Sequence, residues 1–243
     1  MEIVLSSASH HAMLFAFLAK ETIDTFGEAG KQAVSAGVNR YGEQRGHRMA
    51  LRTQADGYPL DVEHYLLYGE WEAFPGQMDL RFPTYAPEAK MQNFRCPWYT
   101  EWSKRGLEEY GRYYCKDVDA ALARGYNGME LTLNANRMLG DNCCDFTFRN
   151  CGIPPEQMED FSRKRAKLGS KAKMPWEYHV GHIFRTMKEA VVSAFGAEGE
   201  AAVARALKSY RAEYGEDAEA LVLKYADIDY DVMPEYPGIE SEG

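Results

Sequence analysis

Hydrophobic side chains at the two ends of the chain recur with a helical period. In residues 9–54 the apolar positions fall three or four apart, and Gly27 and Gly30 interrupt the stripe. The simplest interpretation is two helices joined near these glycines. The helical period resumes over residues 175–225, after a basic connection with prolines at residues 153–174. The pattern therefore predicts a pair of helices at each end of the chain.

The centre of the chain changes to alternating apolar and polar positions. This period of two predicts four strands, at residues 78–82, 91–94, 129–133 and 144–148. A helix of about residues 107–124, ended by Gly125, lies between the second and third strands. A loop with Gly140-Asp141-Asn142 separates the last two strands, which we expect to pair as a hairpin. The fold class predicted is α+β, a small antiparallel sheet of about four strands packed with N-terminal and C-terminal helix pairs.

The two helical ends also resemble each other in sequence. Residues 10–46 align without a gap on residues 179–215. The matched pairs are His10 with His179, Phe15 with Phe184, Phe26-Gly27 with Phe195-Gly196, Gly30 with Gly199, Tyr41 with Tyr210 and Gly46 with Gly215. Two helix pairs of similar build are one interpretation, and a chance likeness of amphipathic helices broken at glycine is the other. Two copies are too few for a solenoid.

Composition and charge limit the class of protein. With 243 residues, 45% of them hydrophobic, the chain can bury a sizeable core. We expect a single domain over residues 1–226 and an acidic, flexible tail over residues 227–243. The net charge of −9 and the lack of a dense Lys/Arg run argue against nucleic-acid binding. Whether the chain forms a homo-oligomer stays open.

The sequence also bears on the cellular compartment. Residues 1–5 carry an acid where a signal peptide has positive charge, and no stretch reaches the roughly 18 to 20 apolar residues of a membrane span. The five cysteines are odd in number, which favours free thiols over a disulfide framework. We therefore expect a soluble, cytoplasmic protein that has a small-molecule substrate and no membrane partner.

A thiol and a carboxylate share one face of the predicted central helix. Cys115 and Asp119 are four residues apart, which makes them neighbours on that face. The negative charge of Asp119 raises the pKa of a nearby thiol and so does not activate it. Asp119 is better suited to hold a substrate cation, orient a water or ligate a metal. The alternative is a buried, inert Cys115 and a solvated Asp119.

The last predicted strand presents two different faces. Cys144, Phe146 and Phe148 share one face, which suits a core or an apolar pocket. Asp145 and Arg149 lie on the other face, where a plain surface ion pair is the simplest interpretation.

Other residues allow metal or base chemistry. Cys96, Cys115 and Cys144 could converge on a metal or an iron-sulfur cluster, although their spacing is not a compact CxxC motif. His179 and His182 share a helix face and could ligate a metal or supply a base, or could be satisfied structural histidines. The sequence contains no HExxH, GxSxG or Walker motif and no convincing GxGxxG, so the corresponding enzyme classes lack support.

Residues 114–127, Gly140-Asp141 and Cys144-Asp145-Phe146 together resemble the signature of the L-2-amino-thiazoline-4-carboxylic acid hydrolase family. That pattern has a thiol, an acid four residues later, a glycine before a polar loop, and Cys-x-Phe. Cys96-Pro97 resembles the first cysteine of the family, and Phe26-Gly27 and Arg45-Gly46 are similar too. The likeness touches most of residues 15–150. Cys143 precedes Cys144, and the Cys-x-Phe register favours the second thiol.

The resemblance implies a hydrolase-like domain that opens a five-membered cyclic isothiourea. Water adds to the carbon between two nitrogens and sulfur, and cleavage of the C–S bond gives N-carbamoyl-L-cysteine. The catalytic residues implied are Cys115, Asp119, Cys144 and His179. The substrate-binding residues implied are Cys96, Arg137, Asp145, Phe146, Arg149 and His182.

Two other functions remain open at this point. One is an enzyme that holds a metal or iron-sulfur centre through Cys96, Cys115 and Cys144 and acts on a sulfur- or nitrogen-containing small molecule. The other is a non-catalytic protein that binds a small ligand. No particular cofactor is expected for the hydrolase, and whether it binds a metal stays open.

Overall fold

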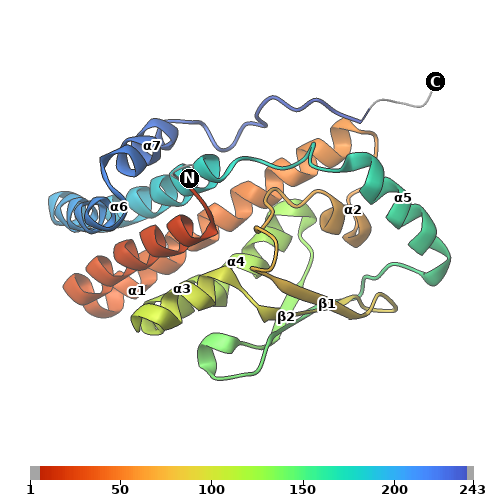
Figure 1. Cartoon of the computed structure of the whole chain (residues 1–243), viewed down its shortest axis with the longest axis horizontal. Coiled ribbons are helices and arrows are strands. Elements are labelled where there is room, and N and C mark those ends of the chain that lie inside the picture. Colours follow the sequence, from red (N-terminus) through yellow and green to blue (C-terminus); the bar gives the residue numbers. More distant parts are fainter. Residues whose placement is uncertain (1–5, 240–243) are drawn as a thin grey trace.

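The first helical region is a tight hairpin. The structure is a computed structural model and describes residues 6–239 (Figure 1). Helix α1 (Ala8–Ala55) leaves helical geometry at Gly27, with φ 58° and ψ −127°. The chain turns back there so closely that a Cβ on Gly30 would lie 2.5 Å from the carbonyl oxygen of Thr22. The prediction of two helices joined at Gly27 to Gly30 is confirmed.

Helix α6 (Trp176–Tyr214) repeats this hairpin. Gly196, which aligns with Gly27, has φ 55° and ψ −131°. A Cβ on Gly199 would lie 2.6 Å from the carbonyl oxygen of Val191. The rings of Phe26 and Phe195 stack on each other, with centroids 3.8 Å apart and an interplanar angle of 4°. The aligned segments therefore share their local structure and meet at equivalent residues.

The central sheet has the four predicted strands. They are β1 (Asp79–Thr84), β2 (Lys90–Arg95), β3 (Leu131–Ala135) and β4 (Cys144–Phe148), in the order β1-β2-β4-β3. Every neighbouring pair is antiparallel, and β3 pairs with β4 as expected. Phe146 stands opposite Met91 on one side and Leu133 on the other. The α+β fold class is confirmed.

Helix α4 (Glu108–Asn127) is the predicted central helix, but it ends at Gly128 rather than at Gly125. Gly125 stays helical, and its missing Cβ lets the backbone of Glu43 approach, because a Cβ there would lie 2.2 Å from the carbonyl oxygen of Glu43. A short helix, α3 (Pro97–Arg105), precedes α4 and was not predicted. Pro97 starts this helix, since the first turn does not need its missing N–H.

The C-terminal part of the chain is more ordered than the sequence predicted. The basic connection contains η2 (Pro155–Gln157) and α5 (Met158–Leu168), and α7 (Glu216–Ala226) follows α6. The remaining short elements are α2 (Val62–Leu67) and η1 (Arg137–Leu139).

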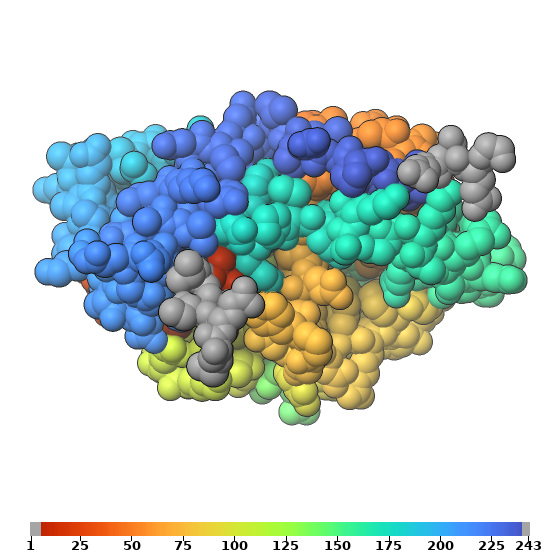
Figure 2. Space-filling view, turned by 45° about the horizontal axis from the view of Figure 1, so that its top comes forward, coloured from red at the N-terminus to blue at the C-terminus, as the bar shows by residue number. Residues whose placement is uncertain are grey.

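The acidic tail packs against α1 instead of fraying. Tyr230 is buried, the hydroxyl of Tyr236 donates to Asp56, and the N–H of Ile239 donates to the same carboxylate at 2.8 Å. Figure 2 shows this segment in dark blue along the surface of the molecule. The tail that we expected to be flexible over residues 227–243 therefore makes packing contacts up to residue 239. Residues 1–5, used in the signal-peptide argument, and residues 240–243 lie outside the described part.

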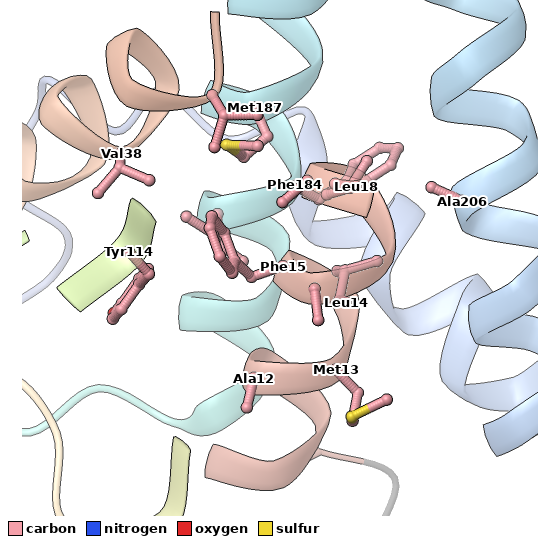
Figure 3. Close-up of a cluster of buried hydrophobic side chains, with 14 of the residues drawn as sticks. Ala12, Met13, Leu14, Phe15, Leu18, Val38, Tyr114, Phe184, Met187 and Ala206 are labelled. Carbon is pink, nitrogen blue, oxygen red and sulfur yellow. The ribbon is translucent and has the colours of Figure 1, made fainter. Parts of the chain in front are cut away.

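The layers place α1 at the centre of the molecule. Its largest contacts are with α4 on one side and α6 on the other, so the sheet and the C-terminal helices lie on opposite sides of α1 (Figure 1). Tyr114 of α4 points at Phe15 of α1 in the core, with ring centroids 5.1 Å apart (Figure 3). Gly42 and Gly46 let α4 approach, because a Cβ at either would overlap α4 atoms. Among residues 6–239 no helix is long and apolar enough to cross a membrane.

Candidate functional site

A cavity of about 580 Å³ lies between the sheet, α4, the second half of α1 and the loop at residues 69–78. This volume fits a small-molecule ligand. Five of the predicted site residues line it, namely Cys96, Cys115, Asp119, Cys144 and Phe146. The structure thus brings together side chains that are up to 50 residues apart in the sequence.

Each of these side chains is placed by a regular element. Cys115 and Asp119 lie one turn apart on α4, as their spacing predicted. Cys96 is the residue that caps the start of α3. Cys144 begins β4 opposite Asn93 of β2, and it shares a face with Phe146. Cys96 thus comes from the start of α3, Cys115 from one face of α4 and Cys144 from β4, and all three line the same cavity.

The three cavity thiols are protonated at neutral pH. Burial raises the pKa of Cys96 to about 12. Burial also raises the pKa of Cys115 and of Cys144, and the nearby charge of Asp119 adds to both shifts. A thiol in this state is a weak hydrogen-bond donor and a poor nucleophile until a base removes its proton.

Asp119 is the cavity group whose charge changes closest to neutral pH. Burial raises the pKa of its carboxyl to about 6, and the positive charge of Arg45 partly offsets this rise. Within residues 6–239 its carboxylate has no hydrogen bond or ion pair, so only a ligand or water can satisfy it. A buried carboxylate in this state attracts a cationic group or accepts a proton.

A buried ionic cluster borders the cavity at Arg45 and Glu70. Glu70 accepts two hydrogen bonds from Arg48, at 3.0 and 2.8 Å, and one from Arg52 at 2.5 Å. Arg45 Nε lies 3.6 Å from the same carboxylate. Burial alone would raise the pKa of Glu70, but Arg48 and Arg52 outweigh it and hold the pKa well below its usual range. Glu70 is thus a buried anion shared by three guanidinium groups.

His179 and His182 lie behind this cluster and do not line the cavity. The Nε2 of His179 donates to the carbonyl oxygen of Glu70 at 3.2 Å, and the Nε2 of His182 is 2.8 Å from Gln44 Oε1. Burial lowers the pKa of His179 to about 3 and also lowers that of His182. Both imidazoles are neutral, and both belong to the buried network rather than to the cavity surface.

Besides His182, three predicted substrate-binding residues lie away from the cavity, namely Arg137, Asp145 and Arg149. Arg137 donates to the carbonyl oxygen of Phe94 at 2.6 Å. Asp145 accepts hydrogen bonds from the amides of Gln92 and Asn134 on the other face of the sheet.

Arg149 also differs from the prediction. Its Nε donates to Thr132 at 2.9 Å, and it pairs with Glu88 at 3.5 Å. The prediction of an ion pair between Asp145 and Arg149 is therefore wrong, since each side chain contacts other residues on neighbouring strands or loops.

Two cations that line the cavity were not predicted as site residues. Arg45 belongs to a row with Arg48 and Arg52, at spacings of three and four among the buried residues of α1. Such a row is a signal that the sequence did offer. Lys173 donates to the carbonyl oxygen of Gly69 at 2.6 Å, and it comes from an irregular segment with no pattern of its own.

The donor set does not fit a metal. Among residues 6–239 no group of three or more His, Cys, Asp or Glu side chains is arranged to hold a metal ion. Cys96, Cys115 and Cys144 share the cavity without forming such a group, and we derive no step through a metal or cluster.

The family model for L-2-amino-thiazoline-4-carboxylic acid hydrolase matches residues 7–148, which is more than half of the chain. The chain belongs to this family. The matched part runs from α1 to β4 and contains every cavity residue described above except Lys173. The comparison with curated proteins and the comparison with solved structures each found no match. The family name implies a hydrolase.

Proposed function

We propose that this family member hydrolyses a small cyclic isothiourea or amidine in the cavity. The substrate resembles L-2-amino-thiazoline-4-carboxylate and the product resembles N-carbamoyl-cysteine. The observation that carries the proposal is the half-buried carboxylate of Asp119, which has no partner among residues 6–239 and faces a cavity that is also lined by three protonated thiols. A ring with an amidine-like group offers the N–H donors that this carboxylate lacks.

Asp119 also has the pKa that the reaction needs. Its carboxyl, with a pKa raised by burial to about 6, is ionised at neutral pH and can accept a proton from an attacking water. The water oxygen bonds to the ring carbon, the C–S bond breaks, and the proton held by Asp119 passes to the leaving sulfur. Atoms balance as one water consumed and one free thiol formed.

The thiols have a supporting part in this scheme. Cys115 and Cys144 are neutral because burial raises their pKa, so they add no negative charge beside Asp119. Their S–H groups face the space that the ring occupies and act as weak donors to charge that develops on it. Phe146 supplies the apolar wall against which a five-membered ring packs.

The test is direct product analysis. Purified protein is incubated with L-2-amino-thiazoline-4-carboxylate in H₂¹⁸O, and N-carbamoyl-L-cysteine is measured by mass spectrometry. We expect ¹⁸O in the carbamoyl group of the product. Asp119→Asn should slow turnover by ~100- to 10,000-fold, the usual range for loss of a general base.

The thiol variants complete the experiment. Cys115→Ala and Cys144→Ala should also lose turnover, whereas Cys151→Ala should not. Cys151 lies outside the cavity lining, with its sulfur 3.8 Å from that of Met129. Wild-type rates in Asp119→Asn, Cys115→Ala and Cys144→Ala would remove these residues from the mechanism, and no product from the wild type would overturn the substrate assignment.

A further inference from the structure

The end of the cavity at Glu70 holds more positive than negative charge. Arg45, Arg48 and Arg52 are exposed by only 4%, 0% and 1%, and they surround a single carboxylate. The neighbouring imidazoles do not change this balance. Burial lowers the pKa of both His179 and His182, which are therefore neutral. Buried charge without an opposite partner is unfavourable, so three guanidinium groups around one carboxylate leave a demand for an anion.

Arg45 is the member of the cluster that is free to meet this demand. Arg48 is held by two hydrogen bonds to Glu70 and one to the carbonyl oxygen of Tyr230. Arg52 donates to Glu70 at 2.5 Å. Among the described residues, Arg45 Nε and Arg52 Nη2 are both buried without a hydrogen-bond partner, but Arg45 is the one of the three arginines that lines the cavity.

The surroundings of Arg45 hold its guanidinium plane in position. It lies 5.4 Å from the ring centroid of Tyr41 and 5.9 Å from that of Trp71. A planar guanidinium fixed in this way can donate two parallel hydrogen bonds to a carboxylate.

Lys173 adds a second cation to the same wall. Its ammonium group donates to the carbonyl oxygen of Gly69, which leaves further N–H donors on the same nitrogen. The acidic groups that act on it are Glu72 and Glu70, and the basic groups are Arg45 and Arg165. Both acidic and basic groups therefore act on Lys173, and of the two basic groups Arg45 also lines the cavity.

We propose that Arg45 and Lys173 bind an anionic carboxylate of the substrate and thereby hold its ring with the reacting carbon toward Asp119. The orientation toward Asp119 rests on the hydrolase proposed above, whereas the binding of a carboxylate does not. The cavity then has one end that recognises an anion and one end that recognises an amidine.

The experiment measures binding rather than turnover. Isothermal titration calorimetry compares thiazolidine-4-carboxylate with thiazolidine-4-carboxamide, two saturated rings in which the carbon between nitrogen and sulfur is a CH₂ group instead of an isothiourea carbon. The wild type should bind the carboxylate ~10- to 100-fold more tightly, the range for hydrogen bonds to a charged group. Arg45→Gln should abolish this preference and leave the affinity for the carboxamide unchanged.

A matched control lies on the same helix. Arg40 is exposed and pairs with Asp231 at 2.5 Å, so Arg40→Gln removes one positive charge without touching the cavity. It should keep the wild-type preference. Because Arg45 borders a buried cluster, the fold of each variant is checked by thermal unfolding. Lys173→Gln, whose head group lies outside the Glu70 hydrogen bonds, should reduce the preference even if Arg45→Gln does not fold.

The outcomes separate this inference from the proposed function. Equal affinity for the two probes, or no carboxylate binding at millimolar concentration, overturns it even if the protein hydrolyses a neutral ring. A wild-type preference that survives in folded Arg45→Gln and in Lys173→Gln overturns the assignment of these residues. Charge-selective binding that depends on both residues, in a protein without hydrolase activity, leaves the inference standing and removes the proposed function.

Discussion

Helices α1 and α6 contain the same hairpin, yet among the described residues that line the cavity two, Arg45 and Met49, come from α1 and none from α6. Both helices reverse at a glycine with nearly the same dihedral angles, Gly27 and Gly196. The two helices diverge at the aligned pair Gly46 and Gly215. Helix α1 continues past Gly46 to Ala55 and so carries Arg48 and Arg52 into the core. Helix α6 ends at Tyr214, before Gly215, which has φ 89°.

The packing of a third helix accounts for this difference. Gly42 and Gly46 lie against α4, and a Cβ on Gly42 would come within 2.6 Å of Ala121 Cβ. The residue of α6 that aligns with Gly42 is Arg211, which is exposed and pairs with Glu219. No helix can approach so closely there. The site therefore arises where α4 packs on one copy of the repeated hairpin.

Buried histidines at aligned positions should give the largest effect on stability. Burial lowers the pKa of His10 to about 4 and that of His179 to about 3, from an ordinary value of 6.5. Between pH 6.5 and these values only the unfolded state binds the proton, so stability falls as the pH falls. Each histidine should cost about 1.4 kcal/mol per pH unit, or about 2 kcal/mol between pH 6.5 and pH 5.

The measurement is urea unfolding at a series of pH values. The slope of the free energy of unfolding against pH should fall in each of His10→Gln and His179→Gln by the amount that one proton contributes. This result would show that both copies keep their histidine neutral. The raised pKa of Asp119 acts in the opposite direction, because its protonation below pH 6 favours the folded state. An unchanged slope in one variant would mean that the two copies differ at this position.

The next effect concerns the residue pair that separates the two copies. Gly42→Ala should be destabilising by about 2 kcal/mol, from about 3 for overpacking against α4 less about 1 for the better helix propensity of Ala. Arg211→Ala should cost no more than about 1 kcal/mol, because only exposed ion pairs are lost. Equal losses of unfolding free energy in the two variants would contradict the role given to α4.

The smallest effect concerns the contact that joins the copies. Phe26 and Phe195 stack nearly parallel, so a double-mutant cycle with Phe26→Leu and Phe195→Leu should give a coupling of about 1 kcal/mol. The free energy of unfolding of the wild type, both single variants and the double variant supplies the cycle. Additive losses would show that the two hairpins are not held together here.

Local patterns in the sequence predicted much of the fold. The break at Gly27, the four strands and the β3–β4 hairpin follow from periodicity and turn residues, which act over a few positions. Helices α3 and α5 were missed for two reasons. Pro97 starts a helix rather than only ending a strand, and α5 buries only Phe161 and Leu168, too few to show a periodic stripe.

The site was predictable only where its residues lie on one element. The spacing of Cys115 and Asp119, and the shared face of Cys144 and Phe146, placed these side chains together correctly. Arg137 and Arg149 were expected to bind the substrate, but the cavity takes its cations from α1 and from Lys173. Tertiary packing between distant segments sets that choice, and no local pattern encodes it.

The central claim is that Asp119 in this cavity is the group whose ionisation drives hydrolysis. The measurement that tests it most directly is the pH dependence of kcat/KM with L-2-amino-thiazoline-4-carboxylate. Burial raises the pKa of Asp119 to about 6, so kcat/KM should rise about tenfold per pH unit below pH 6 and level off above it. The Asp119→Asn variant should lose most of its kcat/KM, and the remaining activity should not show this rise below pH 6. A flat profile through pH 6, or a wild-type rate in Asp119→Asn, would contradict the account.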